Sequence, residues 1–313
     1  MQVITDLTES PWPGERAVVT IGAYDGVHRG HRAVIDEVKQ LAAAEGCRSA
    51  VITFDRHPAS IVRPESAPNL LTDLDQKLEL LADTGVDATV LVRFDEQQSF
   101  ETATDFVERV LVGCLRTRTV VVGEDFHFGR QRSGNVALLR ELGAVHDFAV
   151  DGRDLVQRAD GVEEPISSTA IRRALAGGQV ELAAEMLGRP YETRGPVVKG
   201  DQRGRLLGFP TANVEVPNKV CMPADGVYAG WYLRPDGISH PCAINLGRRP
   251  TFYEHADHSL LEAHLIDFDS DLYAERARVQ FTHFLRSERK FDGIEALIAQ
   301  LKTDVDHARE FLG

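Results

Sequence analysis

Five short runs of β-branched residues divide the first half of the chain, and the segments between them carry apolar residues at helical spacing. Val34, Val38 and Leu41 show that spacing clearly. Continuous apolar strands that alternate with amphipathic helices predict a parallel sheet covered on both faces. The expected strands are 17–22, 50–54, 88–94, 119–123 and 145–150.

The pattern of apolar and polar residues changes after Gly188-Arg189-Pro190. The second half predicts antiparallel strands in a small barrel. Its apolar runs are short, partly alternating and separated by Gly, Pro, Asp and Asn. They cover residues 226–233, 242–246, 261–268 and 277–284. Two short helices, 169–176 and 180–187, are expected before the change, so we expect domains at 1–187 and 188–313.

One helix is expected at the end of the chain. Asp292 with Glu295 resembles a capping box at its start. An apolar stripe follows and is expected to be core. The stripe consists of Ile294, Leu297, Ile298, Leu301 and Val305.

Bulk properties narrow the class of protein. A chain of 313 residues is longer than one core usually organises, and its net charge of −13 argues against a nucleic-acid partner. Four scattered cysteines, without metal or redox spacing, favour a cytoplasmic location. The first eight residues do not read as a secretion signal, and no apolar run approaches the roughly 20 residues that span a bilayer. We therefore expect a cytoplasmic enzyme with no membrane partner; self-association is not readable from the sequence.

The sequence Gly22-Ala-Tyr24-Asp25-Gly26-Val-His28-Arg-Gly30-His31 runs from a strand end into a helix start. Its glycines let phosphate oxygens approach backbone amides, and the helix N-terminus favours an anion. His28 and His31, three residues apart, can face the same side of the first helical turn. Half of a metal site is the alternative, but a third ligand at suitable spacing is missing. A phosphate site is therefore predicted here.

A second element, Ser167-Ser168-Thr169-Ala170-Ile171-Arg172, combines helix-capping hydroxyls with an arginine one turn later. Together the two elements resemble the HxGH nucleotidyltransferases, specifically the FMN adenylyltransferase module of bacterial bifunctional enzymes. Further matches are Thr53–Pro58 and Val122–Gly129.

This resemblance implies a Rossmann-like domain that transfers AMP from ATP to FMN. His28 and His31 would stabilise the reacting phosphates. The phosphate site would also include Gly22, Tyr24, Asp25, Gly26, Gly30, Ser168, Thr169 and Arg172. The implied flavin site consists of Phe54, His57, Pro58, Asp125, Phe126 and Phe128.

The second half contains a glycine-arginine stretch, 195–213, that ends in Gly208-Phe-Pro-Thr211-Ala-Asn213. Gly200, Arg203 and Gly204 suit a loop folded around phosphates. Thr211 and Asn213 share one face of an extended strand, and their oxygens suit Mg²⁺. A basic turn is the alternative. Three alternating aspartates, 267, 269 and 271, lack the glycine of a calcium loop and are expected in a solvated turn or strand face.

The stretch resembles the riboflavin kinase signature, with matches at 223–230, 244–247 and Glu262-Ala-His264. The resemblance implies a barrel of the riboflavin kinase type in which Glu262 is the general base and Thr211 and Asn213 hold Mg²⁺. Riboflavin plus ATP would give FMN, and FMN plus ATP would give FAD. Two alternatives stay open: an HxGH adenylyltransferase for another phosphorylated acceptor, or a flavin-binding regulator with one or both sites inactive.

Overall fold

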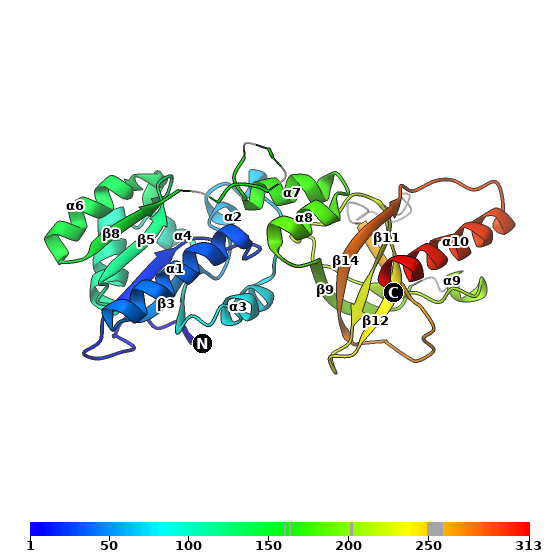
Figure 1. Ribbon diagram of the computed structural model, residues 1–313, viewed down its shortest axis with the longest axis horizontal. Coiled ribbons are helices and arrows are strands. Elements are labelled where there is room, and N and C mark those ends of the chain that lie inside the picture. The colour runs from blue at the N-terminus through cyan, green and yellow to red at the C-terminus, as the bar shows by residue number, and fades with distance from the viewer. Residues whose placement is uncertain (155, 160, 163, 201–202, 249–258) are drawn as a thin grey trace. The chain divides into compact units, whose positions relative to one another are not determined.

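The computed structural model describes residues 1–154, 156–159, 161–162, 164–200, 203–248 and 259–313 (Figure 1). It divides into two compact units, Met1–Ser167 and Ser168–Gly313. Within the described ranges, no helix combines the length and the apolar character that a bilayer crossing needs.

The first unit is built on a six-stranded parallel sheet with the order β1-β4-β3-β2-β5-β8. The strands are β1 (Gln2–Ile4), β2 (Ala17–Ile21), β3 (Arg48–Phe54), β4 (Ala88–Val92), β5 (Thr119–Gly123) and β8 (Ala149–Arg153). The helices are α1 (Arg29–Glu45), α2 (Ala59–Val62), η1 (Pro64–Ser66), α3 (Leu74–Ala82), α4 (Glu96–Ser99), α5 (Ala103–Phe106), the π-helix η2 (Val107–Cys114), η3 (Arg130–Arg132) and α6 (Val136–His146). A small hairpin joins β6 (His127–Phe128) to β7 (Gly134–Asn135).

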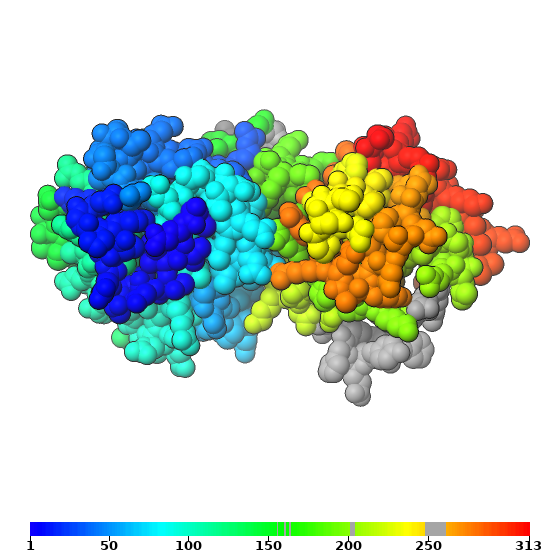
Figure 2. All heavy atoms as spheres, turned by 90° about the horizontal axis from the view of Figure 1, so that it is seen from below, coloured from blue at the N-terminus to red at the C-terminus, as the bar shows by residue number. Residues whose placement is uncertain are grey.

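The predicted parallel sheet is confirmed, but the edge strands were poorly placed. The strand expected at 145–150 exists but is displaced along the chain, because α6 continues to His146 and β8 runs from Ala149 to Arg153. Val145 is 76% exposed, so its β-branched side chain carries no core contact. The other edge strand, β1, lies outside the expected strands and pairs with the buried β4; Figure 2 shows the dark blue N-terminal segment at the surface of the first unit.

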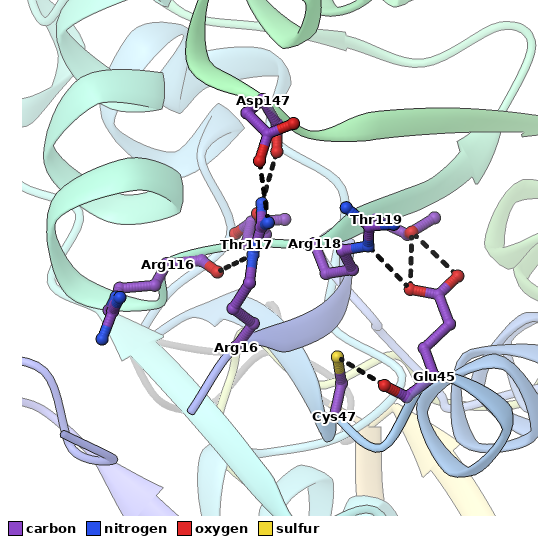
Figure 3. Close-up of polar contacts among 8 residues, drawn as sticks. All are labelled: Arg16, Glu45, Cys47, Arg116, Thr117, Arg118, Thr119 and Asp147. Carbon is purple, nitrogen blue, oxygen red and sulfur yellow. Dashed lines mark hydrogen bonds and ion pairs between the residues drawn. The ribbon is translucent and has the colours of Figure 1, made fainter. Parts of the chain in front are cut away.

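A polar cluster fixes the amino ends of β2, β5 and β8 (Figure 3). The Arg16 guanidinium donates to the Thr117 carbonyl at 2.8 Å and pairs with the Asp147 carboxylate at 2.9 Å. Beside it, the Thr119 hydroxyl donates to the Glu45 carboxylate at 3.4 Å. The loops at the opposite, carboxyl ends of the strands are those that carry the predicted site residues.

The second unit is a closed barrel of antiparallel strands in the order β10-β13-β12-β11-β14-β9, which confirms the predicted barrel. Its strands are β9 (Tyr191–Val198), β10 (Ala212–Val214), β11 (Gly226–Leu233), β12 (Ser239–Arg248), β13 (Ser259–Leu265) and β14 (Arg276–Arg286). Its helices are α7 (Ser168–Ala176), α8 (Val180–Leu187), α9 (Arg203–Leu206) and α10 (Ile294–Leu312). Helix α8 packs against β14 and β9, so it is counted with this unit.

The terminal helix α10 lies beside β11 and β12, as Figure 1 shows, but its details differ from the prediction. The expected capping box is wrong: Gly293 is the N-cap, and no side chain caps the helix. The expected core stripe is also wrong in part, because Ile294 is 61% exposed. The buried positions are Asp304, which pairs with Arg286 at 2.7 Å, and Ala308. The helix is therefore held to the barrel by an ion pair as well as by apolar contacts.

Candidate active sites

The predicted pair of histidines is brought together at the start of α1. His28 is the N-cap, and its Nδ1 accepts a hydrogen bond from the His31 backbone N–H at 3.3 Å. The two imidazole rings stack with centroids 3.5 Å apart. Because Nδ1 of His28 accepts this hydrogen bond, the tautomer that fits the contact carries its proton on Nε2 and can donate from there.

The His31 ring is electrostatically unusual. Its side chain is half-buried, yet its Nδ1 is inaccessible and has no hydrogen-bond partner among the described residues. Burial, and then electrostatic repulsion by a protonated His28 and by Lys77, lower the pKa of His31 well below its usual 6.5. His31 is therefore neutral at physiological pH.

The loop before the histidines is strained and tightly held. Tyr24 and Val27 have positive φ angles of 50° and 39°, which a β-branched residue such as Val27 rarely adopts. The buried Asp25 carboxylate accepts hydrogen bonds from the backbone N–H groups of Leu71 at 2.9 Å and Thr72 at 3.1 Å. Asp25 thus holds the loop in place.

The glycines of this loop are explained by close contacts. A Cβ on Gly22 would approach the Tyr24 ring to 3.0 Å, and Gly26 has a φ of 85°. A Cβ on Gly30 would lie 3.2 Å from the His28 ring and 3.4 Å from the Ile166 carbonyl. The segment that leads directly into Ser167 therefore lies beside the histidine loop. Ser168 and Thr169 form the first turn of α7, with Arg172 one turn later, and are described with the second unit.

Two further loops carry the residues predicted to bind flavin. Phe54 ends β3 and packs edge-on against Phe94, with ring centroids 5.3 Å apart. His57 accepts a hydrogen bond from the Ala59 backbone N–H at 3.1 Å, and Pro58 precedes α2. Both contacts order the loop that follows β3.

The second flavin loop follows β5. Phe126 and Phe128 stack with centroids 5.4 Å apart, while Asp125 is exposed. Phe128 is only 8% exposed and belongs to the core, so little of its ring is open to a ligand. Phe126, which is partly buried against the same core, has more surface to offer.

Sequence reasoning missed Lys77, which lines a small hollow with Asp25, Asp55 and His57. It lies on α3, where a lysine normally reads as a solvated residue, and no motif singled it out. Its side chain is buried and donates to the Phe54 carbonyl at 2.7 Å.

In the second unit, three polar residues lie side by side across neighbouring strands of the barrel. Asn213 on β10 is directly opposite Glu262 on β13, which is in turn directly opposite Asn245 on β12. Directly opposite residues point to the same face, so these three form one polar row. Asn245 was matched only as part of a motif, and the register now gives it a place beside the predicted base.

The predicted metal ligand Asn213 is well prepared for a cation. Its side chain is 7% exposed, and its Oδ1 is buried without a hydrogen-bond partner among the described residues. A buried carbonyl oxygen without a partner is costly unless something binds it. Mg²⁺ prefers such hard oxygen ligands. The described residues contain no cluster of three or more His, Cys, Asp or Glu side chains suited to a metal.

The glycine loop is shaped around these ligands. A Cβ on Gly200 would lie 2.5 Å from the Asn213 amide, and a Cβ on Gly204 would lie 2.4 Å from the Phe209 carbonyl. Gly200 therefore lets the loop lie directly on the Asn213 side chain. Arg203 begins α9; its side chain lies outside what the structure describes.

His264, two residues after Glu262 on β13, fixes the turn that bears Thr211. Its Nδ1 forms a hydrogen bond of 2.7 Å with the Pro210 carbonyl, and its ring packs edge-on against Phe209. β13 thus carries both the predicted base and a side chain that holds the neighbouring loop.

A cavity of about 340 Å³ adjoins this arrangement. Thr211 and Asn213 line it, as do Arg205 and the segment of residues 268–273. Asp269 and Asp271, expected in a solvated turn or strand face, belong to this lining. The cavity therefore places a basic side chain and the two predicted metal ligands around one space.

Known protein families match both halves of the chain. A family model for FAD synthetase matches residues 11–170, and one for riboflavin kinase matches residues 187–312. The chain is 38% identical to the bifunctional riboflavin kinase/FMN adenylyltransferase of Listeria monocytogenes, over 97% of this chain and 95% of that protein. The chain belongs to the bifunctional riboflavin kinase/FMN adenylyltransferase family.

Other members of this family give the same result. The protein of that description from Escherichia coli K12 is 38% identical over 99% of this chain and 96% of its own length. A crystal structure described as a macrolide-efflux protein from Streptococcus pneumoniae is 29% identical and has a TM-score of 0.86 over 98% of both chains. That likeness covers the fold of the whole chain.

Proposed function

We propose that this chain makes FMN from riboflavin and ATP in its second unit, and FAD from FMN and ATP in its first. Both family models match, and full-length relatives carry both activities in their description. The functional domains that we propose are 1–187 and 188–313; the two family matches end at residue 170 and begin at residue 187, and the compact units divide earlier, after Ser167. None of the four cysteines forms a disulfide, which supports a cytoplasmic location.

The stacked histidines support the first reaction most directly. A phosphate oxygen of FMN attacks the α-phosphorus of ATP, and pyrophosphate leaves. Nε2 of His28 donates to the phosphate oxygens on which charge accumulates, and the amides at the start of α1 add to this stabilisation. No covalent nucleophile is needed, because such transfers depend on position and charge stabilisation.

The remaining predicted residues take supporting parts in this proposal. Ser168, Thr169 and Arg172 hold the leaving pyrophosphate, and Arg172 can do so bidentately. The loops of Phe54–Pro58 and Asp125–Phe128 line the isoalloxazine site, with Phe126 as the more accessible aromatic ring. Asp25 contributes by holding the phosphate loop in shape.

The buried, unpartnered Oδ1 of Asn213 supports the second reaction. Mg²⁺ would bind Thr211 and Asn213 and would neutralise charge on the ATP phosphates. Glu262 takes the proton from the terminal ribityl hydroxyl of riboflavin as its oxygen attacks the γ-phosphorus, and ADP leaves. The nucleotide occupies the cavity lined by Arg205 and Thr211, and the loop with Gly200, Arg203 and Gly204 lies over its phosphates.

One experiment tests both assignments. Purified protein is given riboflavin, ATP and Mg²⁺, and FMN and FAD are followed by chromatography. The wild type should form FMN and then FAD, His28→Ala should accumulate FMN, and Glu262→Ala should form neither unless FMN is supplied. Binding of flavin without turnover of either substrate would show a regulator instead of an enzyme.

A further inference from the structure

The buried side chain of Lys77 ties together the carboxyl ends of two central strands. Lys77 is 7% exposed, and its ammonium donates to the Phe54 carbonyl at 2.7 Å, at the end of β3. It also contacts the Ala23 carbonyl, two residues beyond β2, at 3.4 Å. The Thr53 hydroxyl donates to the same Ala23 carbonyl at 3.1 Å and lies 3.4 Å from the ammonium.

Each of these strand ends begins a loop of the proposed adenylyltransferase site. Ala23 opens the strained loop that leads to His28, and Phe54 opens the loop that contains His57. A backbone with positive φ at Tyr24 and Val27 persists only where its surroundings hold it. Asp25 anchors the middle of that loop, and Lys77 anchors its beginning.

Lys77 is a buried group with several charged neighbours and does not belong to a single surface ion pair. Burial lowers the pKa of Lys77 to about 8, against the opposing effect of Asp25 and Asp55, so it remains largely charged at pH 7. Asp55 is itself paired with Arg56 at 3.1 Å. The charge of Lys77 acts on His31 and, with burial and His28, lowers its pKa.

We propose that Lys77 is a positioning residue for AMP transfer: its ammonium holds the ends of β2 and β3 so that the histidine loop and the His57 loop face the same substrate. This inference rests on the proposed adenylyltransferase function. It assigns no step of riboflavin phosphorylation to Lys77, because every contact described above lies in the first unit.

The test compares Lys77→Met, which keeps an unbranched side chain without charge, with Lys77→Arg, which keeps charge and donors. Lys39→Met is the matched control, since Lys39 also donates to a backbone carbonyl of the first unit, that of Thr84, away from the site. For each protein, FAD formation from FMN and ATP and FMN formation from riboflavin and ATP are measured separately. The protonation of the His31 imidazole is followed by NMR, and its signal is assigned by its absence from the spectrum of His31→Asn.

Lys77→Met should lower kcat for FAD formation about 10- to 100-fold, the size expected for displaced catalytic groups, while FMN formation stays at the wild-type rate. His31 should protonate at higher pH in Lys77→Met than in the wild type. Lys77→Arg should recover part of the lost activity and keep His31 hard to protonate. Lys39→Met should match the wild type in every measurement.

Wild-type FAD formation by Lys77→Met, or a loss of activity that leaves the His31 titration unchanged, would overturn the inference. If Lys77→Met unfolds the first unit, Lys77→Gln, which keeps a donor without charge, decides the question by the same two measurements. Failure of the wild type to convert FMN to FAD would instead reject the proposed function.

Discussion

The imidazole rings of His28 and His31 stack in parallel with their centroids 3.5 Å apart, and the first ring caps the helix on which the second lies. One side chain therefore serves both the stability of α1 and the proposed chemistry. The two roles can be separated, because an asparagine can cap a helix but has no imidazole.

His28→Ala should lose both roles, whereas His28→Asn should lose only the chemistry. We expect both variants to lower FAD formation by roughly 10²- to 10³-fold, the usual effect of removing a donor to a developing oxyanion. Only His28→Ala should also lose stability, by about 1 kcal/mol, as typical of a removed N-cap. Turnover assays and urea unfolding measure the two effects, and full activity in His28→Asn would contradict the assignment.

The first unit should lose stability on acidification because of His31. Its pKa is lowered in the folded protein, so below about pH 6.5 the unfolded chain binds a proton that the folded protein does not. Unfolding then becomes easier as pH falls, by at most about 1.4 kcal/mol per pH unit from this one group. Urea unfolding between pH 5 and 8 should show a weaker pH dependence for His31→Asn than for the wild type. A pH dependence as steep in His31→Asn as in the wild type would contradict this prediction.

Gly200→Ala should damage the kinase reaction through steric contact alone. The new Cβ would lie 2.5 Å from the Asn213 amide, so either the loop or the Asn213 side chain must move. We expect a fall in FMN formation and a higher Mg²⁺ requirement, while FAD formation from supplied FMN is unchanged. Gly293→Ala is the matched control, because a Cβ there meets nothing within 4 Å. Equal activity of the two alanine variants would reject the proposed contact.

Glu262→Gln and Asn213→Ala should impair riboflavin phosphorylation in different ways. Glu262→Gln keeps the shape of the side chain but cannot take a proton, so kcat should fall about 10²- to 10⁴-fold at every Mg²⁺ concentration. Asn213→Ala removes an oxygen ligand, so its loss of rate should be relieved in part by excess Mg²⁺. Titration of FMN formation with Mg²⁺ distinguishes the two, and an identical response would mean that they share one role.

The sequence predicted the central strands of the sheet better than its edges. β2, β3, β4 and β5 lie between other strands and carry continuous apolar runs. β1 and β8 are the edge strands, are less buried, and have weaker patterns. The sequence also did not predict β9. Glu192 and Arg194 give this segment a polar pattern, whereas in the structure they are buried and form an ion pair.

The sites were predictable wherever their residues lie close in sequence. His28 and His31 are three residues apart, so helix geometry alone places them on one side. Asn245 and Lys77 were missed because only strand register and tertiary packing bring them to their neighbours. A sequence motif identifies residues that lie close together along the chain. Lys77, however, is 54 residues away from Ala23, whose carbonyl it contacts.

The polar row of Asn213, Glu262 and Asn245 exists in only one alignment of β10, β13 and β12. A shift of any of these strands by a single residue would turn the residue that it contributes to the row toward the opposite face of the sheet. A barrel whose last strand pairs with its first offers no free border along which such sliding could begin. The topology of the barrel thus sets the spacing between the proposed base and the proposed metal ligand, and mutations in the barrel loops can change turnover while this spacing is kept.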